Sequence, residues 1–305
     1  MFKKLAPYIL YMHKPLFSII IPVHNEEEHI VPTINSIITQ TEQDFEIIIV
    51  NDGSTDRTLL QIQPYLRKHK NIKVISFDNG HSAAFARNRG IEQARGKYVV
   101  FQDGDCYADM CLLNNAAKWF DDLPIDGLAT RTSNVPPKNW IQRAVATQRS
   151  IRWENTYKSA MIKYLDKDSG INVAIMKREA INALGGFSES IFYFEDNDLT
   201  KRFFESGRSA IFAPDVIQYH NDPLTLKESI GQCKSIAKGM KIRGKISTKE
   251  TLMFVFALVG LVNLASYFLI FLHMLIKSRD IFGSFYFTIL WEIRTLFKLY
   301  YFLSR

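Results

Sequence analysis

Phe17-Ser-Ile-Ile-Ile-Pro-Val23 is a short apolar run near the start of a chain of 305 residues. An apolar run without alternation, rich in β-branched side chains, is typical of a strand that is buried on both faces, as in a parallel sheet. The polar segment His24-Asn-Glu-Glu-Glu28 turns the chain, and isoleucines then recur at helical spacing from Ile30 to Ile38. These residues predict a buried strand followed by a helix.

The same pairing of a strand with a helix is repeated further along the chain. Apolar runs at Glu46–Val50 and Ile72–Phe77 predict strands, and helical periodicity follows each of them, at Leu59–Leu66 and Ala83–Arg95. A fourth strand is expected at Lys97–Phe101. Strands that alternate with helices are typical of an α/β fold with a Rossmann-like, mostly parallel, doubly wound sheet.

The second half of the chain is less regular. We expect a strand at Ser169–Met176 and a helix that begins at Phe194-Glu-Asp-Asn-Asp198 and ends at Gly207. Two further short strands are predicted at Ala210–Ala213 and Val216–Tyr219. These elements would complete the same sheet.

Acidic residues follow two of the predicted strands. Asp52 comes after the second strand, and Asp103 and Asp105 come after the fourth. Ligands of open α/β sheets bind at the carboxyl ends of the strands. Carboxylates at that edge indicate a divalent cation or a ligand with many hydrogen-bond donors, although Asp-Gly is also a common turn signal.

The composition excludes several classes of protein. Apolar residues make up 47% of the chain and charged residues 23%, which is incompatible with a disordered, collagen-like or coiled-coil chain. The cysteines are Cys106, Cys111 and Cys233, and no Cys-x-x-Cys pair occurs. They are too few for a disulfide framework, argue against a structural zinc site and indicate a reducing compartment.

Positive charge is concentrated ahead of an apolar C-terminal region. The net charge of the chain is +7, and residues 227–249 contain seven basic residues and one acidic residue. Residues 252–276 contain no charged residue and are long enough to span a bilayer. A basic amphipathic helix beside such a segment suits an anionic membrane surface better than nucleic acid, and a solvated basic face is the alternative.

These features predict four regions: an N-terminal extension at 1–16, an α/β domain at 17–222, a basic amphipathic juxtamembrane helix at 223–250, and one or two membrane segments at 251–305. The basic flank puts the α/β domain on the cytoplasmic face of the cytoplasmic membrane by the positive-inside rule.

Six short motifs in this order and spacing resemble those of family 2 glycosyltransferases, which are inverting enzymes with the GT-A fold. The motifs are Ile21-Pro-Val-His-Asn-Glu26, Val50-Asn-Asp-Gly-Ser-Thr-Asp56, Ala86-Arg-Asn-Arg-Gly90, Phe101-Gln-Asp-Gly-Asp105, Gly185-Gly-Phe187 and Glu195-Asp196. The resemblance covers about residues 17–222. It implies a GT-A fold there and a nucleotide-sugar donor.

The resemblance also implies a cation site. Asp105 would bind Mn²⁺ or Mg²⁺ directly, and Asp103 would lie near the ribose or in the metal shell. His220 would complete that shell or touch the diphosphate. Hard oxygen ligands suit both ions, and imidazole is an acceptable ligand of Mn²⁺.

Further residues are implied to bind the nucleotide. Asp52 would accept a hydrogen bond from the base, as a carboxylate can from the imide of uracil, so UDP-sugars are the expected donors. Pro22, Val23 and Glu26 would line the base and ribose pocket. Arg87 would approach the base or the diphosphate, unless it is a surface charge on a helix.

The Glu-Asp pair is implied to be catalytic. The acceptor hydroxyl must lose a proton as it attacks the anomeric carbon, and one positioned carboxylate suffices as the general base. The resemblance assigns this role to Asp196 and makes Glu195 an orienting or acceptor-binding neighbour. Direct displacement would invert the anomeric configuration.

The sequence therefore predicts a membrane-anchored, metal-dependent glycosyltransferase. Its acceptor would be a hydroxyl, such as that of a lipid-linked glycan in the synthesis of bacterial surface polysaccharides. A catalytically inactive scaffold at the membrane and a polyprenyl-phosphate glycosyltransferase are the alternatives. A nucleotidyltransferase is disfavoured because Pro22-Val-His-Asn25 contains no glycine-rich phosphate loop.

Overall fold

The computed structural model of the chain describes residues 14–140, 142–143, 146, 163–165, 172–191 and 194–221, and residues 225, 227, 230, 272 and 275–276. The chain divides into two compact units, Met1–Thr132 with Ile162–Tyr219 and Ser133–Met161 with His220–Arg305. Apart from those isolated positions, the predicted regions 223–250 and 251–305 lie outside the described residues. No helix among the described residues is both long enough and apolar enough to span a bilayer.

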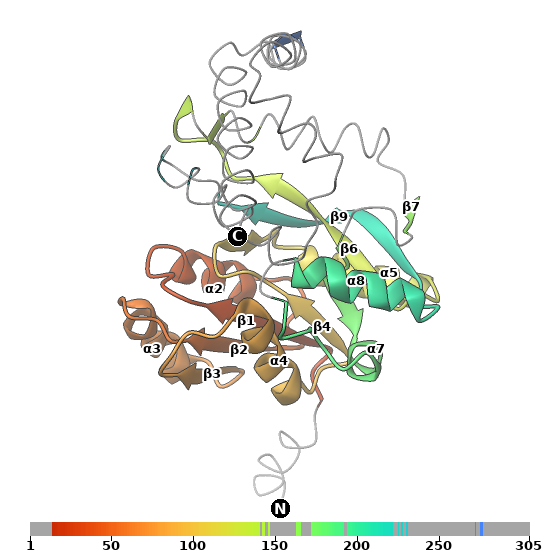
Figure 1. Ribbon diagram of the computed structural model, residues 1–305, viewed down its shortest axis with the longest axis horizontal. Coiled ribbons are helices and arrows are strands. Elements are labelled where there is room, and N and C mark those ends of the chain that lie inside the picture. The colour runs from red at the N-terminus through yellow and green to blue at the C-terminus, as the bar shows by residue number, and fades with distance from the viewer. Residues whose placement is uncertain are drawn as a thin grey trace, which may run out of the picture. The chain divides into compact units, whose positions relative to one another are not determined.

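Four parallel strands form one part of the sheet (Figure 1). In spatial order they are β3 (Ile72–Phe77), β2 (Phe45–Asp52), β1 (Phe17–Val23) and β4 (Tyr98–Phe101). The chain winds outward from β1 to β3 and then returns to the other side of β1 with β4. Such a reversal of direction creates a ligand-binding crevice at the carboxyl ends of the two central strands, here β1 and β4.

The other part of the sheet makes it mixed rather than mostly parallel. The order continues from β4 through β8 (Ile175–Lys177), β6 (Gly127–Asn134), β9 (Ala210–His220) and β5 (Cys106–Ala108), and β7 (Lys163–Tyr164) pairs with β9. The pairings of β8 with β4, β8 with β6 and β7 with β9 are antiparallel. The predicted parallel arrangement therefore holds for the first four strands only.

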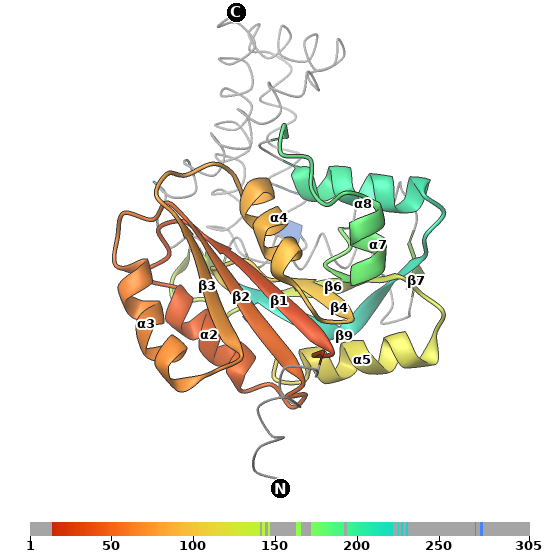
Figure 2. The same cartoon turned by 90° about the horizontal axis from the view of Figure 1, so that it is seen from below.

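Helices cover both faces of the sheet, as the doubly wound prediction requires (Figure 2). On one face lie α2 (Ile30–Ile38), α3 (Thr58–Lys68) and α5 (Leu112–Asp122). On the other lie α4 (Ala83–Gln93), α7 (Arg178–Ala183) and α8 (Glu195–Glu205).

Strand β1 supplies side chains to both of these layers. Ile19 and Ile21 pack with the helices of the first face, and Ile20 packs with those of the second. All three are at most 1% exposed. Burying an isoleucine side chain contributes about 1.5–3 kcal/mol. This two-sided burial is the physical reason why the run is apolar without alternation.

Strand β9 corrects the prediction of two short strands at Ala210–Ala213 and Val216–Tyr219. Its first half pairs with β7, and the N–H of Asp109, next to β5, donates to the carbonyl of Ile217 in its second half. Pro214 lies where the neighbouring strand changes, so the N–H that proline lacks does not interrupt either pairing. Residues 169–171 of the predicted strand Ser169–Met176 lie outside the described residues, and β8 is Ile175–Lys177.

The packing of α4 on β1 can be tested by a substitution at Gly90. A methyl group there would place its carbon 2.3 Å from Cγ2 of Ile20. An alanine in a helix interior normally stabilises by about 1 kcal/mol relative to glycine. Here we expect Gly90→Ala to lower the free energy of unfolding by about 1–3 kcal/mol in urea titrations, because the core would be overpacked.

The control is the same change in an Ile20→Ala background, which removes the colliding group. Gly90→Ala should then be neutral or stabilising. An equal loss in both backgrounds would show that the contact with Ile20 is not the cause.

Candidate functional site

The Asp103-Gly104-Asp105 turn after β4 is fitted closely against the loop after β1. The hydroxyl of Thr33 donates to the carbonyl of Gly104 over 2.7 Å. A side chain at Gly104 would place its Cβ 3.1 Å from Cγ of Glu26 and 3.2 Å from Cγ1 of Val23. The structure thus brings together predicted residues from two motifs at the crevice between β1 and β4.

The side chain of Val23 is 2% exposed and belongs to the core, and its Cγ1 lies against Gly104. Pro22 is half-buried beside it, and its carbonyl lies near Gly104. Glu26 pairs with the imidazole of His29 at 3.0 Å, and this hydrogen bond raises the pKa of His29. The three residues predicted to line the pocket therefore lie around Gly104, and the carboxylate of Glu26 is already paired with His29.

Asp52 at the end of β2 is held by two histidines. Its Oδ2 accepts the backbone N–H of His81, and its Oδ1 lies 2.9 Å from Nδ1 of His81. Nδ1 of His24 lies 2.7 Å from the Asp52 carbonyl. The ring of His81 stacks on Phe85, with centroids 4.1 Å apart. Sequence reasoning missed the role of His81, because it lies 29 residues from Asp52 and outside the motifs.

Arg87 in α4 joins two regions that are far apart in the sequence. Its Nη2 lies 2.7 Å from Oδ1 of Asp103, and its Nη1 lies 2.5 Å from Oε1 of Glu195 at the start of α8. The guanidinium also lies 5.4 Å from the ring centroid of Phe187. Burial disfavours its charged form, but the two carboxylates outweigh that penalty and raise the pKa of Arg87.

Asp196 follows Glu195 in the first turn of α8. Its Oδ1 accepts the N–H of Asn197 over 2.8 Å, and its Oδ2 accepts from the side-chain amide of Asn172. Burial and then the charge of Glu195 raise the pKa of Asp196 above its ordinary value, while Arg87 opposes the rise. A carboxylate with a raised pKa is a stronger base.

The backbone of the residue that precedes α8 is strained. Phe194 has φ 63°, a left-handed conformation that residues other than glycine seldom adopt. Such strain costs of order 1–3 kcal/mol and persists where the surroundings hold it. It turns the chain so that Glu195 and Asp196 begin the helix.

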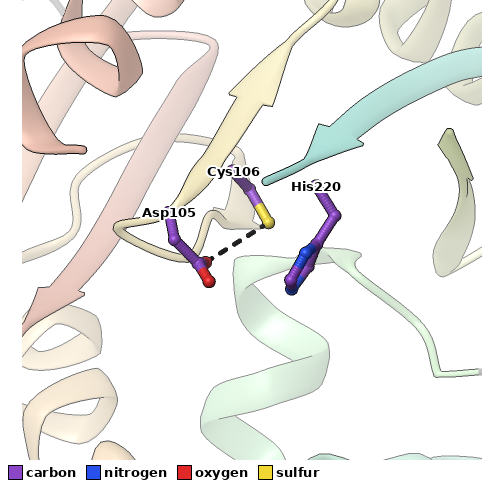
Figure 3. A group of neighbouring side chains, drawn as sticks. All are labelled: Asp105, Cys106 and His220. Atoms are coloured by element: carbon purple, nitrogen blue, oxygen red, sulfur yellow. Dashed lines mark hydrogen bonds between the residues drawn. The ribbon is translucent and has the colours of Figure 1, made fainter. Parts of the chain in front are cut away.

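Asp105, Cys106 and His220 form a second group, in which the possible ligand atoms all lie within 4.8 Å of one another (Figure 3). Sγ of Cys106 lies 3.6 Å from Oδ1 of Asp105. His220 is the last residue of β9, and the division between the compact units falls just before it. Ligands at about 2.0–2.3 Å from an ion lie within roughly 4.6 Å of one another, so these donors fit a divalent cation after small shifts.

The two aspartates of the turn therefore have different neighbours. Asp105 lies with His220, as the sequence predicts for two metal ligands, and with Cys106, which was not predicted. Asp103 is instead paired with Arg87, and its side chain is 52% exposed. The carboxylate of Asp103 therefore remains partly accessible to solvent beside Arg87.

Comparisons with known proteins identify relatives of this chain. The family model described as Glycosyl transferase family 2 matches residues 18–185. The chain is 27% identical over 208 residues to glycosyltransferase AglE of Haloferax volcanii, covering 68% of this chain and 67% of that protein. It is 30% identical over 227 residues to glycosyltransferase EpsJ of Bacillus subtilis, covering 70% of this chain and 63% of that protein.

Solved structures share the fold. TarS 1-349 of S. aureus in complex with UDP-GlcNAc matches with a TM-score of 0.56 and 22% identity, over 73% of this chain and 66% of that one. The mannosyltransferase PcManGT from Pyrobaculum calidifontis, in complex with GDP-Man and Mn2+, also gives 0.56, with 20% identity over 78% and 66% of the chains. The match thus spans about two thirds of the length of these relatives.

The ion pairs of Arg87 can be tested by removing its charge. We expect Arg87→Met to lower the free energy of unfolding at neutral pH by about 3 kcal/mol, because it leaves the buried Glu195 carboxylate without its partner. Urea titrations at neutral pH measure this loss.

Arg89→Met is the matched control, because Arg89 forms more exposed pairs with Glu92 and Glu189. It should cost less than about 1 kcal/mol. Equal losses for the two variants would contradict a special contribution from the buried pair of Arg87 and Glu195.

Proposed function

Because this chain belongs to glycosyl transferase family 2, we propose that it is an inverting glycosyltransferase that moves a sugar from a nucleotide-sugar donor to a hydroxyl acceptor. The observation that carries this proposal is the position of Arg87. It holds Asp103, on the side where the donor would bind, beside Glu195 of the acidic pair. The carboxylate proposed to lie near the donor and the acidic pair proposed to be catalytic are therefore both next to Arg87.

The donor we propose is a UDP-sugar, with a GDP-sugar as the second candidate. Asp52 would accept the imide N–H of the base, and Pro22, Val23 and Glu26 would line the base and ribose pocket. The complexes of the structural neighbours contain UDP-GlcNAc or GDP-Man, which supports a nucleotide-sugar donor without choosing between them.

A divalent cation, Mn²⁺ or Mg²⁺, would be held by Asp105 and His220, with Asp103 nearby. When bound, such an ion stabilises negative charge on the diphosphate leaving group. The hydrogen bond from Thr33 to the Gly104 carbonyl holds the turn that carries Asp105, which supports this role.

Asp196 would be the general base. Asn172 and the N–H of Asn197 orient its carboxylate, and its raised pKa strengthens it as an acceptor of the hydroxyl proton. Glu195, which pairs with Arg87, would position Asp196 or the acceptor. Attack from the face opposite the leaving group gives inversion.

The acceptor we propose is a lipid-linked glycan at the cytoplasmic face of the cytoplasmic membrane, within surface-polysaccharide synthesis. The basic residues of 227–249 and the uncharged run of 252–276 support the membrane location. The names of two similar proteins support the pathway class: a putative teichuronic acid biosynthesis glycosyltransferase of Bacillus subtilis, 40% identical over 92 residues, and a poly(ribitol-phosphate) beta-N-acetylglucosaminyltransferase of Staphylococcus aureus, 34% identical over 122 residues.

The activity is tested by incubating the full-length protein in membranes with a panel of UDP- and GDP-sugars and measuring nucleoside diphosphate release with and without chelator. We expect release from at least one UDP-sugar, loss with chelator and recovery with added Mn²⁺ or Mg²⁺. Absence of release with every donor and a total lipid extract would favour a binding scaffold.

The role of Asp196 is tested by Asp196→Asn, which keeps the shape of the side chain and removes its basicity. We expect kcat to fall by about 10²–10⁴-fold while donor affinity is retained. In the unmodified protein, kcat/KM should rise with pH through an acid limb that lies above the ordinary carboxyl pKa of 3.8, because the base acts only when ionised and burial raises its pKa.

Asp198→Asn provides the control, since Asp198 lies in the same helical turn but pairs with Arg202 at 2.9 Å. Its kcat and pH profile should stay close to those of the unmodified protein. Normal turnover of Asp196→Asn would assign the base to another residue.

A further inference from the structure

We propose that Cys106 is a sulfur ligand of the cation site, so that the site favours Co²⁺ and Zn²⁺ over Mg²⁺. This inference deepens the proposed function, because it takes from it the cation that Asp105 and His220 would hold. Thiolate selects borderline and soft ions, whereas Mg²⁺ demands oxygen ligands. A single sulfur in the set is therefore enough to change which ions compete.

The position of the sulfur supports this role. Sγ of Cys106 lies 3.6 Å from Oδ1 of Asp105, and the ligand atoms of these residues and His220 all lie within 4.8 Å of one another. Figure 3 shows the three side chains converging from the start of β5 and the end of β9. These are neighbouring strands of one sheet, so the backbone holds the three donors in place.

The surroundings of Cys106 are those of a ligand rather than of a core residue. A buried cysteine usually behaves as a small apolar side chain. Cys106 is 5% exposed, yet it belongs to neither of the two apolar clusters of the described residues. Its sulfur faces a carboxylate and an imidazole instead. On binding a cation it would coordinate as the thiolate, and its proton would pass to solvent.

Cys111 offers a matched comparison within the same chain. It lies five positions along the sequence, is partly exposed and precedes α5. It is not a member of the group formed by Asp105, Cys106 and His220. A serine at either position changes one sulfur to oxygen, so differences between the two variants report the site and not the loss of a thiol.

The experiment uses Co²⁺ as the probe and the full-length protein in detergent. Thiolate ligation gives Co²⁺ an intense charge-transfer absorption in the near ultraviolet that oxygen and nitrogen ligands do not produce. We expect this band in the unmodified protein and in Cys111→Ser, and its loss in Cys106→Ser. Competition titrations should show affinity for Co²⁺ and Zn²⁺ falling by roughly tenfold or more in Cys106→Ser, with Mg²⁺ affinity little changed.

A second variant keeps the test decisive if Cys106→Ser does not fold, as judged by cooperative unfolding. Cys106→Asp offers an oxygen ligand at the same position and should lose the band while gaining affinity for Mg²⁺. A band that persists in either Cys106 variant, or its absence from the unmodified protein saturated with Co²⁺, would overturn the proposal.

These outcomes are separate from those for the activity. Sugar transfer by a protein that shows no charge-transfer band would leave the proposed function standing and remove the sulfur ligand. A charge-transfer band in a protein that turns over no donor would support the sulfur ligand and contradict the proposed function, since the band reports only the ion and its ligand.

Discussion

The placement of one buried guanidinium determines how the site is assembled. Arg87 is 11% exposed at its side chain, and an arginine is costly to desolvate unless carboxylates pair with it. Asp103 from the turn after β4 and Glu195 from α8 meet this requirement, although Arg87 and Glu195 are 108 positions apart in the sequence. The neighbouring Asn88 exchanges two hydrogen bonds with the backbone of Phe187, at 2.9 and 2.8 Å. Consecutive residues of α4 thus tie the first half of the sheet to the segment that leads into α8.

This arrangement sets the electrostatic conditions at Asp196. Burial and the Glu195 charge raise its pKa, while the hydrogen bond from the Asn197 N–H and then the charge of Arg87, which pairs with that same Glu195, limit the rise. The balance matters because a general base must be strong enough to take a proton and still be ionised near neutral pH. The left-handed backbone at Phe194 contributes geometrically, since it directs the first turn of α8 toward Arg87. Electrostatics and backbone strain therefore act on the same carboxylate.

The parts of this structure that sequence reasoning predicted are those that depend on local pattern. β1, β2, β3 and β4 follow from apolar runs, and the acidic residues at their ends follow from the rule that polar side chains gather at the carboxyl edge. Helix α5 was not predicted, although Leu112, Leu113, Ala116 and Phe120 repeat at helical spacing. The contact of His81 with Asp52 and the closeness of Cys106 to His220 depend on how loops and strands meet in space. No periodicity within a single segment contains that information.

The balance of charge at this edge of the sheet supports the proposed cation. Asp103, Glu195 and Asp196 lie around a single guanidinium, and Asp105 lies beyond Gly104 in the same turn. The carboxylates outnumber the guanidinium, so Arg87 has no surplus positive charge to offer an incoming diphosphate. Bringing that anion close to these carboxylates would add repulsion between like charges. In the function proposed above, a divalent ion beside Asp105 would supply the opposing charge at the point where the diphosphate would otherwise be repelled, and donor and ion would therefore bind cooperatively.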